Sequence, residues 1–322
     1  MSETVKRFLC LLTATLLATA GQANDSALAV RANKSLTLNL TQLADGRYIA
    51  VGERGHVLRS DDQGASWQQA VVPTRATLTA VARSNGRVFA GGHDGVLLVS
   101  EDRGDSWKLV RSEPSADQDN PVLDIHFATE SIGYAVGAYG LFLKTIDGGQ
   151  TWQQEEIPAF DLPDFGFPHL YRLISLRDNS LLVVGEAGFA ARSSDQGVTW
   201  TRLEIAYEGT FFTARQTASG AILIAGMRGN LFRSTDNGVS WTQVDTGVRS
   251  GLNDIAIGTG EVVVVGMDGV MLLSRDDGQT FSRRQRSNRK AIAAAELMGT
   301  DQLLIAAEDG VSVQSLAAEQ AK

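Results

Sequence analysis

Acidic side chains recur beside glycines in short turns along the chain, and paired carboxylates are the catalytic groups of most glycoside hydrolases. Such an enzyme holds its two carboxyl groups about 5 to 9 Å apart, one as acid and the other as base or nucleophile. Acidic residues are also common as solvated turn residues, and we favour this interpretation because charged side chains are rarely buried without a partner. The acidic residues in equivalent turns are Glu53, Glu186, Asp268 and Glu308.

Metal and cofactor chemistry has little support in the residue types and their spacing. The histidines stand singly in the sequence, without a His-x-x-x-His motif, and no calcium loop or phosphate-binding glycine loop occurs. We therefore predict no metal site and no cofactor. The single cysteine, Cys10, lies near the N-terminus, so the rest of the chain has no disulfide. The four histidines are His56, His93, His126 and His169.

The first residues have the pattern of a secretory signal peptide. Lys6 and Arg7 form a basic start, and an apolar run from Phe8 to Ala20 follows, which is too short to span a membrane as a helix. Small residues allow cleavage after Ala23 or Ala20. We predict a signal peptide over residues 1–23, with an uncleaved anchor or a buried helix as the alternatives.

Composition narrows the function classes. The 322-residue chain has a formal net charge of −8, and an acidic exported protein is a poor candidate for general nucleic-acid binding. It contains 33 glycines but only 6 prolines, which suits many tight turns between short strands.

One eight-residue motif, the octet, recurs six times at intervals of 40 to 48 residues. It reads Ser/Thr-x-Asp-x-Gly-x-Ser/Thr-Trp/Phe, and its first copy runs from Ser60 to Trp67. The aspartate can accept hydrogen bonds from a turn backbone, and the glycine tolerates a positive φ. We predict that the terminal aromatic ring packs beneath the turn or against the next repeat, as a core residue rather than a ligand platform. The aspartates are Asp62, Asp102, Asp147, Asp195, Asp236 and Asp276, and the tryptophans are Trp67, Trp107, Trp152, Trp200 and Trp241.

Three apolar runs precede each octet, and each run predicts one strand. A fourth strand is expected directly after the octet, so one repeat predicts four antiparallel strands. The second and third runs flank a turn that ends in glycine, as in residues 49–58 and 262–273. A period near forty residues with four strands in each period is typical of a β-propeller.

Seven repeats fit the chain, and the last ends without an octet or a fourth strand. We therefore predict an all-β fold: a seven-bladed β-propeller of four-stranded antiparallel blades, forming one domain over residues 24–322. Six or eight blades are the alternatives. The apolar segment from Ala27 to Ala32 has no repeat of its own, and we predict that it supplies the missing outer strand and closes the ring.

The octets resemble the Asp-box, or BNR, repeats of bacterial neuraminidases. The octet together with the preceding Ala-Val-Gly-x-x-Gly strand pair is similar to the photosystem II stability/assembly factor family, and this resemblance covers most of residues 30–315. It implies an exported seven-bladed propeller that is not an enzyme and that helps a new subunit join its membrane complex.

The neuraminidase resemblance does not extend to the catalytic residues of that class. Those enzymes need an arginine triad, a tyrosine–glutamate pair and a further acid, and their early Arg-Ile-Pro motif is absent here. Arg202, Arg215 and Arg228 are present, but their spacing does not mark a triad. A sialidase-like glycoside hydrolase, or a sugar- or peptide-binding propeller, is the alternative function.

Strand alternation sorts the loops onto two ends of the ring. The octets and the turns between first and second strands share one end, the octet face, which we predict to be structural. The turns between second and third strands and the connections between blades share the other end, the hairpin face. Variable loops on a rigid ring are the usual place for binding, so we predict the partner surface there.

Two connections on the hairpin face are the candidate partner sites. Residues 157–171 are aromatic and stiffened by prolines, as expected of a protein-binding anchor, although the rings could instead fold inward. Residues 283–290 are basic, which suits an acidic partner segment or anionic lipid headgroups, although they could instead be an ordinary solvated loop. The candidate residues are Phe160, Phe165, Phe167, His169 and Tyr171 in the first, and Arg283, Arg284, Arg286, Arg289 and Lys290 in the second.

The sequence therefore predicts a monomeric, non-enzymatic, exported protein that binds a protein subunit of a membrane or envelope complex and aids its assembly or stability. The expected location is the periplasm, or the thylakoid lumen in a photosynthetic host. Peripheral contact with a membrane is a further option for the basic segment.

Overall fold

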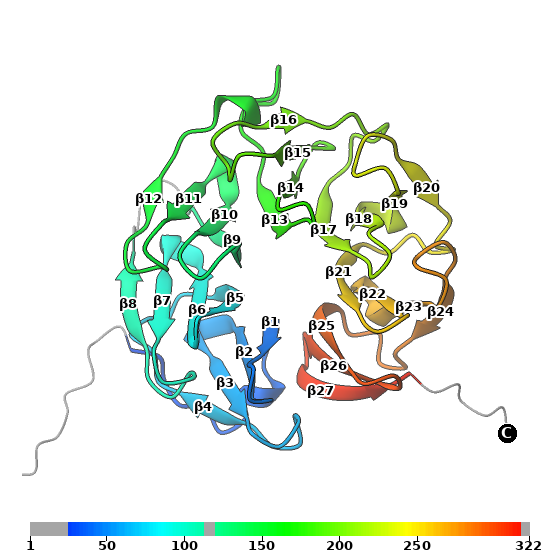
Figure 1. The fold of residues 1–322 in the computed structure, drawn as a ribbon. Helices are drawn as coiled ribbons and strands as arrows, with labels where there is room; N and C mark the ends of the chain where they lie inside the picture. The colour runs from blue at the N-terminus through cyan, green and yellow to red at the C-terminus, as the bar shows by residue number, and fades with distance from the viewer. Residues whose placement is uncertain (1–24, 113–119, 317–322) are drawn as a thin grey trace, which may run out of the picture.

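The computed structural model describes residues 25–112 and 120–316, which form seven antiparallel sheets arranged in a ring around a central axis (Figure 1). The space along this axis is called the central channel. The predicted all-β, seven-bladed propeller is confirmed. The signal peptide predicted for residues 1–23, with Cys10, lies outside the described residues. No helix in the described part of the chain is long and apolar enough to cross a membrane.

Each of the first six blades has four strands, ordered along the chain from the channel outward. The innermost strands are β1 (Thr37–Gln42), β5 (Leu78–Ser84), β9 (Val122–Phe127), β13 (Leu170–Ser175), β17 (Phe211–Gln216), β21 (Leu252–Ile257) and β25 (Ile292–Met298). The second strands are β2 (Tyr48–Gly52), β6 (Arg87–Gly92), β10 (Gly133–Gly137), β14 (Leu181–Gly185), β18 (Ile222–Gly226), β22 (Val262–Gly266) and β26 (Gln302–Ala307). The third strands are β3 (Val57–Ser60), β7 (Leu97–Ser100), β11 (Phe142–Thr145), β15 (Ala190–Ser193), β19 (Leu231–Ser234), β23 (Val270–Ser274) and β27 (Gly310–Ser315). The outer strands are β4 (Gln68–Ala70), β8 (Lys108–Arg111), β12 (Gln153–Gln154), β16 (Thr201–Arg202), β20 (Thr242–Val244) and β24 (Ser282–Gln285).

The octets form compact turns that are held by their own side chains. In the first copy, Asp62 accepts hydrogen bonds from the Ser60 hydroxyl (2.8 Å), the Ser66 hydroxyl (2.6 Å) and the Ser66 backbone N–H (2.8 Å). These bonds lower the pKa of Asp62 to about 2, with the bond from the Ser66 hydroxyl contributing most. The aspartate therefore stays ionised and continues to accept these bonds at any ordinary pH.

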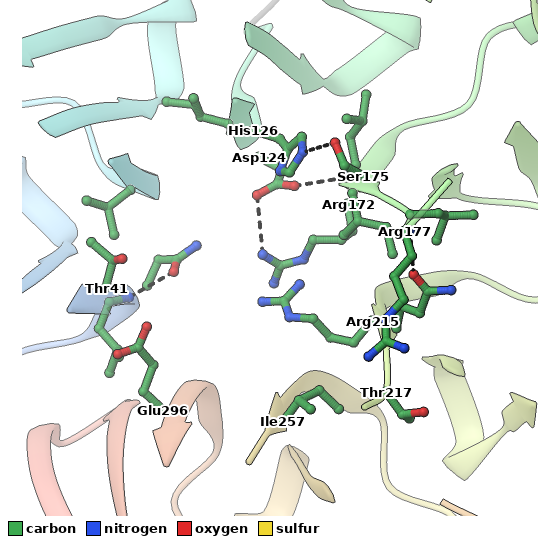
Figure 2. Close-up of a pocket in the computed structure, with 18 of the residues that line it drawn as sticks. Thr41, Asp124, His126, Arg172, Ser175, Arg177, Arg215, Thr217, Ile257 and Glu296 are labelled. Atoms are coloured by element: carbon green, nitrogen blue, oxygen red, sulfur yellow. Dashed lines mark hydrogen bonds and ion pairs between the residues drawn. The ribbon is translucent and has the colours of Figure 1, made fainter. Parts of the chain in front are cut away.

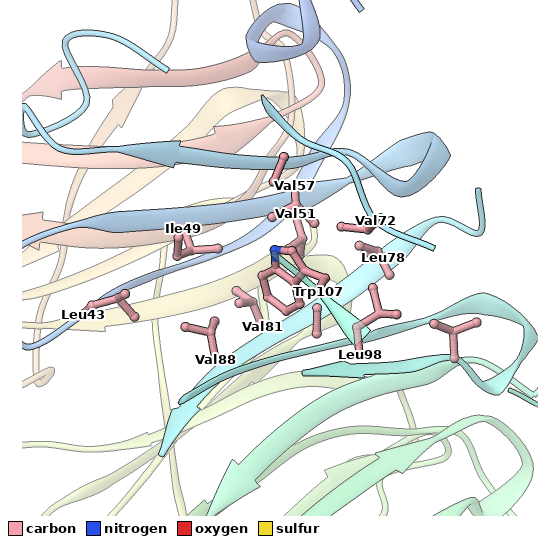
Figure 3. Packing of buried hydrophobic residues seen from close by; sticks show 13 residues of the cluster. Leu43, Ile49, Val51, Val57, Val72, Leu78, Val81, Val88, Leu98 and Trp107 are labelled. Atoms are coloured by element: carbon pink, nitrogen blue, oxygen red, sulfur yellow. The ribbon is translucent and has the colours of Figure 1, made fainter. Parts of the chain in front are cut away.

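Apolar side chains fill the seams between neighbouring blades. In blade 2, the Nε1 of Trp107 donates to the Gly104 carbonyl beneath its own turn (3.1 Å). The ring packs against Ile49 and Val51 of blade 1 (Figure 3). The ring therefore lies beneath its own turn, as one of the two predicted alternatives has it, and its neighbour is the preceding blade rather than the next repeat.

The ring is not closed by a strand from the N-terminus, so this part of the prediction is wrong. Blade 7 has only the three strands β25 to β27. The N-terminal residues 25–31 instead follow the outside of blade 1, where the Ser26 N–H donates to the Val72 carbonyl at 2.8 Å. Leu28 and Val30 are exposed, so the apolar side chains of this segment find no core that would hold a strand against β27.

Side-chain packing and a short 3-10 helix close the seam between blades 1 and 7. The helix is η1 (Ala32–Lys34), and Ala32 is buried with Leu40 of blade 1 and Val311 of blade 7. Gly310 lies directly beneath it with φ +94°, and an added Cβ would lie 2.0 Å from the Asn33 carbonyl oxygen. Only glycine fits where β27 passes under η1.

Candidate functional site

A β-bulge at the start of the innermost strand turns selected side chains into the central channel. In blade 6, the pairing with β22 shifts register between Leu252 and Asp254. Gly266 makes this possible, because a Cβ there would lie 2.0 Å from the backbone oxygen that precedes β21. Bulges at the same place in blades 3 and 4 give Asp124 and Arg172 equivalent positions.

These residues form a buried ion network across the channel. Arg172 of blade 4 lies 3.3 Å from the Oδ1 of Asp124 on blade 3 (Figure 2), and 3.1 Å from the Oδ1 of Asp254 on blade 6. Asp254 also faces the Nη2 of Arg215 on blade 5 (3.4 Å) and accepts a bond from the Ala295 N–H on blade 7 (3.2 Å). Five consecutive blades therefore meet in one network.

The charges in the network are unevenly compensated. Burial opposes the charged form of Arg172, but Asp124 and Asp254 outweigh it and raise its pKa. Burial raises the pKa of Asp124, although Arg172 opposes this. Burial and the nearby Arg172 charge lower the pKa of Arg215. Arg215 is therefore the least compensated cation of the network.

A cavity of about 600 Å³ lies beside the network (Figure 2). Its lining residues show that it reaches the octet face. Arg177 and Ala218, in turns between first and second strands, lie at that end of its wall. Deeper in the channel, the wall includes Arg172, Arg215 and Glu296. The face that we predicted to be structural thus opens onto a charged cavity.

His126 and Ser175 also line the cavity, with the His126 Nε2 and the Ser175 Oγ 2.7 Å apart. Burial and the charges of Arg215 and Arg172 lower the pKa of His126 to about 4. The ring is therefore neutral at pH 7 and too weak a base to activate a serine efficiently. No group of three or more metal-binding side chains occurs within residues 25–112 and 120–316.

Glu296 of blade 7 lines the opposite wall of the cavity, near Thr41 (Figure 2). Burial raises its pKa to about 7. The backbone of Gln42 supplies an opposing hydrogen bond, and the charges of Arg83, Asp254 and Arg215 have smaller effects. The cavity therefore carries a carboxyl group that is partly protonated near neutral pH.

Replacing Glu296 with glutamine should make the protein less sensitive to alkaline pH. The unfolded carboxyl loses its proton near pH 4.3, whereas the folded one keeps it to about pH 7, so wild-type stability falls as pH rises between these values. Urea unfolding should show that Glu296→Gln is more stable than the wild type at pH 8 by about 1 to 3 kcal/mol, with the difference vanishing near pH 4.5. The exposed substitution Glu308→Gln is the control, and a pH-independent difference would contradict the assignment.

The turn carboxylates singled out in the sequence do not meet in a cavity. Glu186 accepts a bond from the His169 N–H (2.9 Å), Asp268 accepts one from the Ser250 hydroxyl (2.7 Å), and Glu308 lies 3.6 Å from the Lys290 ammonium. Neither these three nor Glu53 lines the channel cavity. Each lies at a turn on the hairpin face, as expected of solvated turn residues.

The aromatic segment 157–171 divides between core and surface. Phe160 is fully buried in the seam between blades 3 and 4, and Phe167 packs on Gly140 in the same region. His169 stands edge-to-face against Tyr139 (4.6 Å between ring centroids), and Tyr171 against Phe212 (5.2 Å). Phe165 is 54% exposed, so it is the ring most accessible to a partner.

The basic segment 283–290 connects blade 6 to blade 7, and two of its arginines form hydrogen bonds with blade 7. Both terminal nitrogens of Arg286 bond Asp309 at 3.0 Å, and the Arg286 side chain is only 8% exposed. Arg284 bonds the carbonyl oxygen of Leu316 at the end of blade 7. Arg283, Arg289 and Lys290 remain exposed. The two segments occupy different sectors of the ring (Figure 1), so they do not form one site.

Sequence reasoning noticed Arg215 only as a possible triad member and missed Asp124, Arg172, Asp254 and Glu296. Arg202 lies in the outer strand β16 and Arg228 in a turn, η6 (Met227–Gly229), so neither joins Arg215 in a triad. The sequence did contain a pattern that marks three of these channel residues. In the first apolar run of three repeats, a charged residue stands two places after the first apolar residue: Val-Leu-Asp124, Leu-Tyr-Arg172 and Leu-Asn-Asp254.

Comparison with known protein sequences points to one family. The family model described as photosynthesis system II assembly factor YCF48 matches residues 113–244. The chain is 36% identical over 88 residues to the photosystem II assembly lipoprotein Ycf48 of Synechococcus sp. (strain CC9902), covering 27% of this chain and 24% of that protein. It is 29% identical over 87 residues to the photosystem II stability/assembly factor HCF136 of Arabidopsis thaliana, covering 26% of this chain and 21% of that protein. The matched segments thus span a quarter or less of these relatives, and the predicted resemblance to this family is confirmed.

Solved structures share the fold over nearly the whole chain. The structure of YCF48 bound to D1 peptide superposes with a TM-score of 0.70 at 18% identity, covering 88% of this chain and 94% of that one. YCF48 from Cyanidioschyzon merolae gives 0.70 at 17% identity, covering 91% and 98%. A streptogramin B lyase gives 0.73 at 13% identity, covering 90% and 95%. At these identities, the likeness establishes the propeller fold alone.

Proposed function

We propose that this chain is an exported, non-enzymatic propeller that binds a protein subunit of a membrane or envelope complex and aids its assembly or stability. The observation that carries the proposal is the family match over residues 113–244, together with relatives named as photosystem II assembly factors. A fold neighbour is described as bound to a peptide, which agrees with a protein partner. The relatives named lipoprotein and chloroplastic agree with an exported or lumenal location.

Exposed aromatic side chains on the hairpin face support a protein interface there. Phe165 is 54% exposed, and Tyr139, in the turn η4 (Ala138–Gly140), is 52% exposed. Both belong to the region matched by the family model. Their backbones are held in place, because the buried Phe160 and the partly buried Phe167 anchor the segment to the core, so little conformational entropy is lost on binding.

The basic segment supplies a second, weaker contact. Arg283 and Arg289 are exposed and can face an acidic partner, whereas Arg286 is engaged with Asp309 inside the protein. Exposed charges mainly steer the approach of a partner, so their removal should slow association more than it weakens the bound complex.

A non-enzymatic function agrees with the chemistry of the site. The turn carboxylates are each engaged locally, and the channel carboxylates Asp124 and Asp254 are both paired with Arg172. Two carboxylates that are both ion-paired with one guanidinium group do not form the free acid-and-base pair that a glycoside hydrolase uses.

Site-specific photo-crosslinking in cells should detect the partner from the hairpin face. A photoreactive amino acid at Phe165 or Arg289 should capture one defined subunit of a membrane or envelope complex, identified by mass spectrometry. The same label at Ile146, which is 73% exposed on the octet face, is the matched control. Equal capture from all three positions, or no protein enriched from Phe165 or Arg289, would contradict the proposed function.

A further inference from the structure

We propose that the channel cavity is a binding site for a small organic acid that enters from the octet face, with Arg215 holding its carboxylate. This site is separate from the proposed partner surface, which lies at the other end of the ring. The cavity volume of about 600 Å³ lies in the range of small-molecule sites.

Arg215 has hydrogen-bonding capacity that the protein does not use. Its Nη1 donates to the adjacent Ala214 carbonyl (3.1 Å), and its Nη2 lies 3.4 Å from the Oδ1 of Asp254, which is long for a charge-assisted hydrogen bond. A guanidinium group has five N–H donors in a planar fork that matches a carboxylate. The side chain lines the cavity and is 30% exposed, so donors remain available on the cavity side.

The positive charge of Arg215 is also poorly compensated. The Oδ1 of Asp254 that it faces is shared with Arg172, which lies closer, at 3.1 Å. The Nε of Arg172 is a buried donor without a hydrogen-bond partner among the described residues. Arg172 also has Asp124 as a partner, whereas the ion pair of Arg215 is with the shared oxygen of Asp254, so Arg215 is the group that an additional anion would compensate.

The remaining wall of the cavity indicates a polar acid rather than a fatty acid. Thr41, Ser175 and Glu296 line it and offer hydroxyl and carboxyl groups, and side chains such as Val81 and Ile257 add apolar surface between them. A carboxylate on Arg215 would leave the rest of the molecule facing these groups. Hydroxy acids, amino acids and short dicarboxylic acids match this arrangement.

Calorimetry and thermal unfolding of residues 24–322 would test the site with succinate, L-malate and L-glutamate as probes at concentrations up to 10 mM. Succinamide, which keeps the shape of succinate without its charge, is the matched control ligand. We expect at least one acid to bind and to raise the melting temperature, and succinamide to do neither. Binding should weaken at least tenfold in Arg215→Met, which keeps the aliphatic chain but removes the cation.

A second variant keeps the test decisive if Arg215→Met does not fold. Ala218 is exposed at the octet end of the cavity and is outside the ion network, so Ala218→Trp should fill part of the cavity with its ring and weaken binding without affecting the fold. Arg275→Met, which removes an exposed arginine from the same face, should bind as the wild type does. No binding of the three acids at 10 mM, or equal affinity in the wild type, Arg215→Met and Ala218→Trp, would overturn the proposal.

Discussion

Replacing Asp254 with alanine should lower the free energy of unfolding by about 3 to 5 kcal/mol. Asp254 is 3% exposed and its carboxylate faces Arg172, Arg215 and the Ala295 N–H. Removing it leaves Arg172 with Asp124 as its ion-pair partner and takes away the ion-pair partner of Arg215, and a largely buried cation without a partner is costly. Urea unfolding followed by tryptophan fluorescence would measure the loss.

Two comparisons separate the ion network from a general effect of losing a carboxylate. Asp301→Ala removes an exposed carboxylate and should change the stability by less than about 0.5 kcal/mol. The double variant Arg172→Met/Asp254→Ala should cost less than the sum of the two single substitutions, because both break the same interaction. A loss below about 1 kcal/mol for Asp254→Ala would mean that water screens the charges of Arg172 and Arg215. That result would contradict the burial of the ion network.

Replacing Phe160 with alanine should cost about 3 to 5 kcal/mol, whereas Phe165→Ala should change the stability by less than about 0.5 kcal/mol. Phe160 is fully buried and lies edge-to-face against Phe142, Phe189 and Trp200, with ring centroids 5.3 to 5.8 Å apart. Its removal leaves a cavity in the seam between blades 3 and 4. Thermal and urea unfolding of the two variants would measure the difference.

The same pair of variants distinguishes the core role from the partner role within one segment. Phe165→Ala should reduce capture of the partner while the protein remains as stable as the wild type. Phe160→Ala should affect capture only in proportion to the protein that unfolds. If Phe165→Ala destabilised the protein as much as Phe160→Ala, the division of the segment into core and surface would be wrong.

The blade could be predicted from sequence because its interactions are local. An octet such as Ser60–Trp67 closes its turn with bonds between residues two to four positions apart, and those bonds need only the residue types at that spacing. Four strands in forty residues pair with their chain neighbours, so the period alone predicts the antiparallel blade. The number of blades was predicted by counting the repeats in the sequence.

The partner segments were predicted only in part, because burial depends on what a side chain packs against. Phe160 and Phe165 lie in the same aromatic, proline-rich segment, yet one is fully buried and the other is 54% exposed. The difference is set by Phe142 in β11 and by Trp200 at the end of the blade 4 octet, both outside the segment. Arg286 is engaged for the same reason, because blade 7 places Asp309 beside it.

The N-terminal segment shows how a local pattern can mislead. Residues 27–32 are apolar enough for an edge strand, and blade 7 lacks one. The segment nevertheless follows blade 1, where the Gln69 side chain bonds the backbone of Ala27 and Ala29, and it reaches blade 7 only through η1. Hydrogen bonds to its backbone decided its course, since Leu28 and Val30 are exposed and only Ala32, at its end, reaches the core.

The sequence by itself determined the repeat, the octet turns and the antiparallel blades of this protein, because each depends on residues close together in the chain. Only the tertiary structure decided the channel site. Arg172 and Asp254 are 82 residues apart and meet because the blades curve into a ring and a bulge turns both side chains inward. The charge balance of Arg215, and hence the proposed acid site, follows from that meeting of distant blades.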